Sequence, residues 1–387
     1  MKKKLESLFQ NNEFQLIVKF VLGGVSIIGP ILPKFVPEFI AKNNVWAYIL
    51  ALCIVFVIFL VLIFISELLD ANFDIYKIIA NYHKNKKFSS VVRLAYPLSR
   101  PLWLVGKYKL RIKMGRQIFS ALNSLKDDTI FIDDKNINVE ELKARVLIDD
   151  LGWTIFRTDP NSKESIAHIE RGISIANEEH LCSLAIKGHR HLIGIYDKLR
   201  DEKKMMEHVD KANAILLNNN ILNEEREHIQ KGLDYALLTV EVNSYRRENK
   251  NDTAELNEYI TKINNLSNYY KAKEDWERYA KTFYIKAEIL MLYDSPVKYI
   301  EAKSVLEKGL VMCETQARLD GFIRISIMLM RILNKDIIIQ NDKEERARLI
   351  KEFRNYYSDA MKRAEEIDNK EHISVLNELK RKMGRIG

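Results

Sequence analysis

Cysteine, proline and glycine are scarce in this sequence. Its 387 residues include 3 cysteines, 7 prolines and 14 glycines. Cys53, Cys182 and Cys313 lie far apart and form no CxxC pair, which argues against a disulfide framework and favours a reducing compartment for the soluble part. Because helix-breaking residues are few and Leu, Ile, Lys, Glu and Asn are abundant, the composition predicts a mostly helical chain.

Motifs of several common enzyme classes are also absent. The sequence contains no GxxxxGK[ST], GxGxxG or GxSxG motif, and no arginine precedes histidine at the short gap typical of helical ribonucleases. His189 and His191 lie two positions apart, so on a helix they diverge by ~200° and do not chelate one metal ion together. We interpret Asp133-Asp134 and Asp149-Asp150 as turn and helix-start residues rather than catalytic pairs. We therefore expect no enzymatic activity, no metal site and no cofactor.

One long segment has no charged residue. Residues 45–66 read VWAYILALCIVFVIFLVLIFIS, which at ~1.5 Å per residue is long enough to cross a hydrocarbon core of ~30 Å. Trp46 and Tyr48 at one end are typical of an aromatic belt. This segment predicts a transmembrane helix.

A second apolar segment covers residues 14–33. Lys19 interrupts it, Gly23-Gly24 would allow close helix contact, and Pro30 and Pro33 would bend or end a helix. We expect it to span the membrane, with a re-entrant segment as the alternative.

The distribution of lysine and arginine predicts the orientation of this hairpin. Lys2, Lys3 and Lys4 precede the first segment, only Lys34 and Lys42 lie between the two, and a basic stretch follows the second. By the positive-inside rule both termini face the cytoplasm, which two crossings of the cell (inner) membrane satisfy.

Residues 83–116, the basic segment, carry ten lysines and arginines and no acidic residue, against a net charge of +8 for the whole chain. Such a segment is a topology signal, and it also favours phosphate-bearing partners: membrane lipids, a nucleotide or an oligonucleotide. The candidate binding residues are Lys84, Lys86, Lys87, Arg93, Arg100, Lys107, Lys109, Arg111, Lys113 and Arg116, with Trp103 and Tyr108 for stacking.

From about residue 117 onward, apolar residues recur at helical spacing, apart from TIFIDD at 129–134, which predicts a short extended piece. Asn138, Asp252, Asp342 and Asp368 each precede a glutamate by three positions, a pattern typical of helix starts. We expect helix pairs over 138–158 with 163–177, 180–199 with 202–217, 223–247 with 253–270, 274–293 with 296–313, and 315–335 with 343–367, and a last helix over 369–384. Alternating helix pairs with short loops predict an α-solenoid.

Two of these pairs resemble tetratricopeptide repeats. LGWTIF (151–156) with SIAHIERGISIA (165–176), and HLIGIY (191–196) with HVDKANAIL (208–216), carry the glycines, aromatics and small residues that the resemblance places at close helix contacts. Later helix pairs show the same alternation of helices but lack the motif residues, and the repeats are longer than the usual ~34 residues. The resemblance implies a curved scaffold with a binding groove for a peptide or protein.

We therefore predict an all-α protein in three parts: a transmembrane helical hairpin over 1–68, a basic and mostly helical juxtamembrane linker over 69–137, and a tetratricopeptide-like solenoid over 138–387 with a C-terminal capping helix. Two sets of groove residues could grip an anion: Lys187, Arg190 and His191 share one helical face, and Arg278 and Lys281 share another. The simpler interpretation of both sets is a solvated polar face.

Two functions fit this organisation. In the first, hairpins of a homo-oligomer form a gated ion channel or pore, with Glu67 as a ring of carboxylates and a ligand or partner bound to the cytoplasmic helices. The domain order resembles that of membrane effectors of bacterial antiviral systems, including Hailong-type pairs, which implies control by a nucleotide or oligonucleotide in anti-phage defence. In the second, the hairpin only anchors a scaffold whose groove recruits a protein partner, as adaptors of cell-envelope complexes do.

Overall fold

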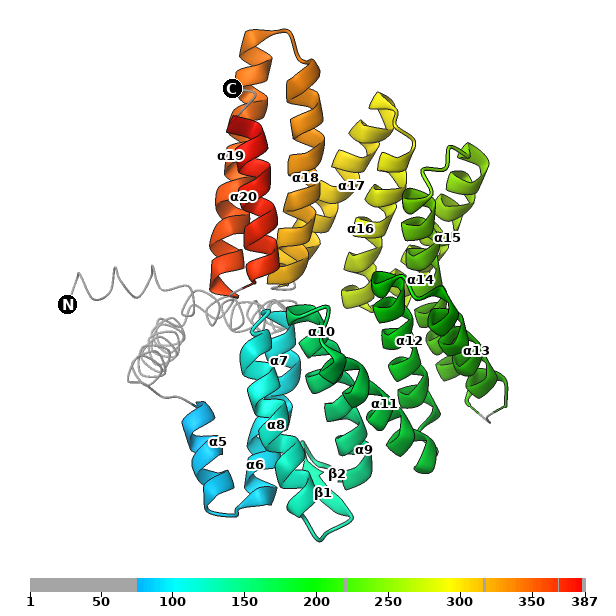
Figure 1. The fold of residues 1–387 in the computed structure, drawn as a ribbon, viewed down its shortest axis with the longest axis vertical. Coiled ribbons are helices and arrows are strands. Elements are labelled where there is room, and N and C mark those ends of the chain that lie inside the picture. The colour runs from blue at the N-terminus through cyan, green and yellow to red at the C-terminus, as the bar shows by residue number, and fades with distance from the viewer. Residues whose placement is uncertain (1–74, 219–220, 316–317, 368, 385–387) are drawn as a thin grey trace, which may run out of the picture. The chain divides into compact units, whose positions relative to one another are not determined.

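A computed structural model describes residues 75–218, 221–315, 318–367 and 369–384 (Figure 1). The two predicted membrane segments and Glu67 lie outside these residues. The chain divides into two units, residues 1–78 and 79–387. In the part that is described, none of the helices combines the length and apolar character needed to cross a membrane.

The second unit is built almost entirely of helices. The N-terminal helices are α5 (Ile75–Lys84), α6 (Phe88–Ala95), η1 (Tyr96–Leu98), α7 (Ser99–Leu104), α8 (Tyr108–Ser124), α9 (Val139–Arg145), η2 (Val146–Trp153) and α10 (Thr154–Thr158). The array continues with α11 (Lys163–Glu178), α12 (Cys182–Leu199), α13 (Glu202–Asn218), α14 (Asn223–Arg247), α15 (Thr253–Ala272), α16 (Trp276–Leu292), α17 (Pro296–Thr315), α18 (Leu319–Ile339), α19 (Lys343–Glu366) and α20 (Lys370–Gly384). The prediction of a mostly helical repeat protein is confirmed at this level.

Helix starts follow the capping pattern of the sequence. The Asn138 side chain accepts hydrogen bonds from the backbone of Glu140 (2.6 Å) and Glu141 (3.2 Å), and Asp252 and Asp342 cap α15 and α19 in the same way. These three starts are confirmed. Asp368 lies outside the described residues, and the side chain of its neighbour Asn369 accepts the first-turn hydrogen bond of α20, from the His372 backbone at 3.0 Å.

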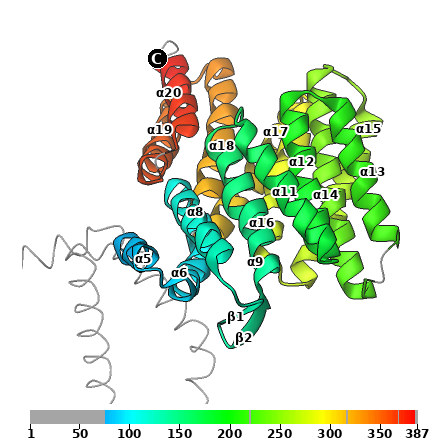
Figure 2. The same cartoon turned by 60° about the horizontal axis from the view of Figure 1, so that its bottom comes forward.

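The extended piece is a two-stranded hairpin (Figure 2). β1 (Thr129–Ile132) pairs antiparallel with β2 (Lys135–Asn138), so that Thr129 lies opposite Asn138. Asp133 and Asp134 form the two-residue turn with φ of 48° and 62°, the left-handed pair of values that suits the twist of a tight hairpin. The interpretation of these two aspartates as turn residues is confirmed.

The interpretation of Asp149-Asp150 as helix-start residues is wrong. The predicted helix over 138–158 is divided into α9, the π-helical segment η2 and α10, and both aspartates lie inside η2. A π-helical turn widens the helix by one residue, which changes the directions in which successive side chains point. Periodicity at 3.6 residues gives no signal for such a segment.

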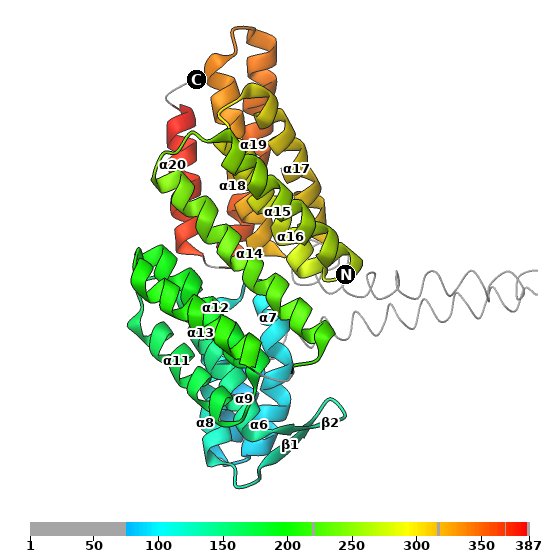
Figure 3. The same ribbon diagram turned by 90° about the vertical axis from the view of Figure 1, so that its right-hand side faces the viewer.

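Consecutive helices pack against each other along the array. α11 contacts both η2 and α12, α12 contacts α13, and the same order continues from α15 to α19. α14 lies beside α12, α15 and α16 (Figure 3). Asp197 of α12 holds it there, because it accepts a hydrogen bond from Asn243 (2.8 Å) and pairs with Arg247 (2.8 Å).

Glycines allow the closest approach between helices. A Cβ added at Gly152 would lie 2.3 Å from Ile169 Cγ1, and one added at Gly172 would lie 2.6 Å from Ile148 Cγ1. Both glycines belong to the first predicted tetratricopeptide-like pair, so they make the close contact expected there. Gly194, from the second pair, has more space, with its nearest neighbour, the Trp153 ring, at 3.9 Å from the added Cβ.

The beginning of the array is joined to its end. Both carboxylate oxygens of Asp320, on α18, accept hydrogen bonds from the guanidinium of Arg157, on α10, at 3.0 and 3.2 Å. Asp320 also pairs with Arg324 at 3.1 Å and accepts a hydrogen bond from His372 of α20 at 2.9 Å. Burial alone would raise the pKa of Asp320, but Arg157, Arg324 and His372 hold that pKa well below its usual range. Residues 163 positions apart are thereby connected.

A second contact reinforces this junction. Lys107 Nζ donates to the backbone oxygen of Glu366 at 2.8 Å. Gly106, with φ of 73°, lies so close to Ile367 that an added Cβ would be 2.9 Å from its Cγ2. The helices therefore form an array that closes on itself, rather than an open solenoid with two free ends.

We predict that Gly152→Ala destabilises the fold by about 1–3 kcal/mol, because the new methyl group overlaps Ile169. The measurement is the free energy of unfolding in urea. Gly194→Ala is the matched control: its Cβ fits, and its better helix propensity should raise stability by up to about 1 kcal/mol. Equal effects of the two substitutions would contradict the close-contact account.

We also predict that Asp320→Ala costs on the order of 3 kcal/mol, since it leaves the cations of Arg157 and Arg324 without their carboxylate. Hydrogen exchange should accelerate in both α10 and α20, which the carboxylate connects. Asp359→Ala removes an exposed carboxylate from α19 and serves as the control. A loss of protection confined to α18 would show that Asp320 does not hold the junction.

Candidate functional site

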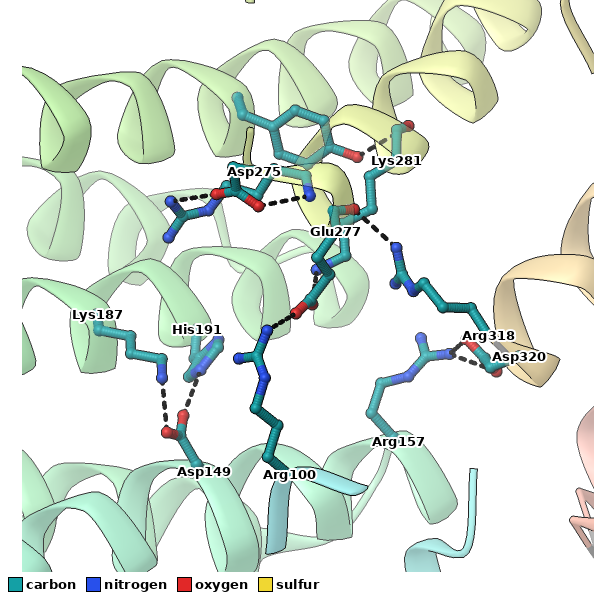
Figure 4. Close-up of polar contacts among 12 residues, drawn as sticks. Arg100, Asp149, Arg157, Lys187, His191, Asp275, Glu277, Lys281, Arg318 and Asp320 are labelled. Atoms are coloured by element: carbon teal, nitrogen blue, oxygen red, sulfur yellow. Dashed lines mark hydrogen bonds and ion pairs between the residues drawn. The ribbon is translucent and has the colours of Figure 1, made fainter. Parts of the chain in front are cut away.

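Charged side chains from α7, η2, α12, α16 and the start of α18 point toward one another (Figure 4). We call this group the cationic cluster. It contains the cations Arg100, Lys187, Arg190, Arg278, Lys281 and Arg318, the carboxylates Asp149, Asp275 and Glu277, and the imidazole of His191.

Asp149 of η2 organises one side of the cluster. It accepts from Lys187 Nζ at 2.6 Å and lies 3.3 Å from His191 Nε2, while the His191 ring stacks on Trp153 with centroids 4.4 Å apart. Burial would raise the pKa of Asp149, but Lys187 and His191 hold it well below its usual range. Burial lowers the pKa of His191 to about 4, so this imidazole is neutral at pH 7.

Glu277 of α16 organises the other side. Its carboxylate pairs with Lys281 at 2.9 Å and with Arg100 of α7 at 3.3 Å, and its backbone oxygen accepts from Arg318 at 2.7 Å. Lys281 is the main cause that lowers the pKa of Glu277 well below its ordinary value. Glu277 therefore stays ionised and ties α7 to α16.

Arg190 lies between these two sides without a partner of its own. It makes no hydrogen bond or ion pair with any residue in the described ranges. Burial and the neighbouring Arg278 lower its pKa to about 10, although Asp149 and Glu277 act in the opposite direction. Its Nη1 lies 2.4 Å from the position of a Cβ on Gly232 of α14, so a larger residue there would require the end of the Arg190 side chain to shift. Arg278 itself pairs with Asp275 at 3.0 Å and lies over the Tyr270 ring.

The cluster has more positive than negative charge. Six cations face three carboxylates, a formal excess of three positive charges with His191 neutral. Arg190 and Arg318 are the members without a carboxylate partner among the described residues. Such an arrangement is suited to binding an anion. Nothing in it pairs a nucleophile with a base, and within the ranges described no group of three or more His, Cys, Asp or Glu side chains could hold a metal ion.

The structure brings the five predicted groove residues into this one cluster. Lys187, Arg190 and His191 share a face of α12 as expected, and Arg278 and Lys281 of α16 lie opposite them. Arg318, Asp149 and Glu277 were not predicted as members of this cluster. The sequence does show that Arg190 has no acidic residue three or four positions away on its own helix, whereas Lys281 has Glu277.

The basic segment is divided among several roles. Arg111 and Tyr108 are buried, and Arg111 pairs with Asp150 at 2.7 Å and donates to Thr154 at 2.9 Å. The guanidinium of Arg111 also lies 5.0 Å from the ring of half-buried Trp103. A role as surface ligands therefore does not fit Arg111 and Tyr108, because the core already uses them.

The remaining members of the basic segment lie nearer the surface. Arg100 contributes to the cationic cluster, Lys107 to the junction with α19, and Arg116 pairs with Glu164 at 2.9 Å. The exposed members are Lys84, Lys86, Lys87, Arg93, Lys109 and Lys113, besides Arg100 and Arg116. This exposed group is the part of the segment that a lipid or nucleic-acid phosphate can reach.

Comparison with known proteins gives little beyond the helical architecture. No protein-family model matches the chain, and no curated protein does. Among solved structures, the chain is similar to a circular tandem repeat protein with novel repeat topology and enhanced subunit contact surfaces, at 13% identity over 81% of this chain and 89% of that one, with a TM-score of 0.21. A score that low carries no argument about spatial arrangement, so the description as a helical repeat rests on this chain's own helices.

We predict that stability falls as the pH decreases from 7 to 5. Burial lowers the pKa of His189 to about 4, with a further contribution from His208, whose Nδ1 lies 3.0 Å from its own. Between pH 6.5 and 4 the unfolded chain therefore binds a proton at this position that the folded chain does not, which costs about 2 kcal/mol by pH 5.

His189→Asn should reduce the difference between unfolding free energies at pH 7 and 5 by about this amount. His180→Asn is the control, since it removes an exposed histidine from a left-handed position, with φ of 57°, that asparagine tolerates. The same pH dependence in the His189 variant and the unaltered protein would contradict this assignment.

Proposed function

We propose that this chain is a membrane-embedded, oligomeric effector in which an anionic ligand bound by the helical array controls a channel or pore. The pore is formed by the N-terminal segments, both termini face the cytoplasm at the cell membrane, and anti-phage defence in bacteria is the proposed setting. The array is proposed to be a degenerate tetratricopeptide-like one.

One observation carries this proposal: the cationic cluster includes a residue of the basic segment. Arg100 of α7 pairs with Glu277 of α16, 177 positions further along the chain. The basic segment follows the predicted membrane hairpin in the sequence, so we propose that a change in the cluster is passed through this segment toward the hairpin. An anion that draws Arg100 away from Glu277 would loosen α7 from α16.

The two adjacent aspartates of η2 offer a second connection. Asp149 faces the cluster through Lys187, whereas Asp150 faces the basic segment through Arg111 and Ser99, which donates to it at 2.5 Å. A shift of η2 on ligand binding would therefore move α8 and α7 as well. This supports a coupled array more than a passive anchor.

A second candidate, a membrane-tethered scaffold that recruits a protein partner, is favoured by one feature. Val297, Ile300 and Val311 of α17 are exposed and recur at positions that share one side of the helix. Exposed apolar side chains in such a stripe suit a protein partner. In this alternative the hairpin only anchors, and the basic segment rests on anionic lipid.

Conductance of the full-length protein in liposomes distinguishes the two. We expect ion flux from the native protein and none when residues 1–66 are replaced by an unrelated membrane anchor. Glu67→Gln should alter cation selectivity, because it removes a charge from the proposed carboxylate ring. If neither form conducts, with or without added nucleotides and oligonucleotides, the effector proposal is wrong and the scaffold is favoured.

A further inference from the structure

We propose that the cationic cluster binds a small, multiply charged phosphate compound through Arg190, Lys281 and Arg318. This inference deepens the proposed function by naming the class of ligand and the residues that hold it. It is tested by binding alone, so its outcome is independent of whether the hairpin conducts ions.

The unpartnered cations are the first argument. A partly buried guanidinium without an acceptor has lost part of its water and gained no partner in exchange, which reduces the stability of the fold. Arg190 is such a group, held beside Arg278 of the same sign. Arg318 uses only a backbone oxygen, at 2.7 Å. A bound anion would supply the acceptors that both guanidinium groups lack.

The positions of these cations are the second argument. Lys281 and Arg318 both contact Glu277, Lys281 its carboxylate at 2.9 Å and Arg318 its backbone oxygen at 2.7 Å. Arg190 of α12 lies within electrostatic range of Lys281, so the three cations come from separate parts of the chain and lie around one region. The Lys281 side chain is 38% exposed and that of Arg278 is 28% exposed, which leaves them accessible to a ligand. The end of the Arg190 side chain lies beside Gly232 of α14, where no side chain fills the space.

The charge excess favours phosphate over a single carboxylate. The cluster's net excess of three positive charges matches a group that carries two or more negative charges, and guanidinium groups bind phosphate oxygens in a bidentate manner. The three cations come from α12, α16 and the start of α18, an arrangement that suits a compact group with several phosphate oxygens. Free polyphosphate and a nucleotide both carry the required chemistry.

The experiment titrates the full-length protein in detergent with each probe at constant ionic strength. Calorimetry measures binding, and thermal unfolding measures the change in unfolding temperature. The probes are sodium triphosphate, ATP and citrate. We expect triphosphate or ATP to bind and to raise the unfolding temperature, as any ligand specific to the folded state does. ATP binding at least tenfold tighter than triphosphate would identify a nucleotide as the source, and equal affinity would identify free polyphosphate.

Arg190→Gln should weaken binding about tenfold or more, in keeping with the loss of a charge-assisted contact. The same variant should not lower the unfolding temperature of the ligand-free protein, because Arg190 has no partner to lose. Arg354→Gln removes an exposed arginine from α19 and should leave the affinity within about twofold.

Three results would overturn the inference: no binding of either phosphate probe, citrate bound as tightly as triphosphate, or the same loss of affinity in the Arg190 and Arg354 variants. Binding without conductance would retain this site and remove the proposed channel. Conductance without phosphate binding would retain the proposed channel and remove this site.

Discussion

The ion pair between Arg157 and Asp320 determines what kind of molecule the helices make. A solenoid of helix pairs has two ends, and each pair needs contact only with its neighbours. Here the carboxylate of Asp320, on α18, forms an ion pair with Arg157 of α10, and His372 of the last helix, α20, contacts the same carboxylate. The array is therefore closed by contacts between its early and late helices.

Closure changes the role of the charged residues between the helices. In an open groove, Lys187 or Lys281 would be a solvated side chain with little effect on stability. In the closed array, cations from α7, α12, α16 and the start of α18 face the same region, and like charges held close together repel one another. The three carboxylates compensate only half of this charge. The excess is a property of the whole array, because no single helix carries it.

Much of the fold follows from local sequence signals. The caps at Asn138, Asp252 and Asp342 and the short loops fix where helices begin, so the observed helices after residue 160 match the predicted ranges within a few residues. The junction at Asp320 was not predictable in this way, because its partner is 163 positions distant and neither residue carries a local pattern. The π-helical segment η2 was not predicted either, since its apolar residues are also compatible with an ordinary α-helix.

The same reasoning explains which site residues the sequence revealed. Lys187, Arg190 and His191 stood out because they share a helical face, a local property. Arg111 was misjudged because composition counts a charge without its partner, and Asp150 lies on another helix. Arg190 is the opposite case, a charge whose partner is missing among the described residues. Arg111 is buried with a carboxylate, whereas Arg190 and Arg318 have none among the described residues, and the proposed phosphate ligand rests on this difference.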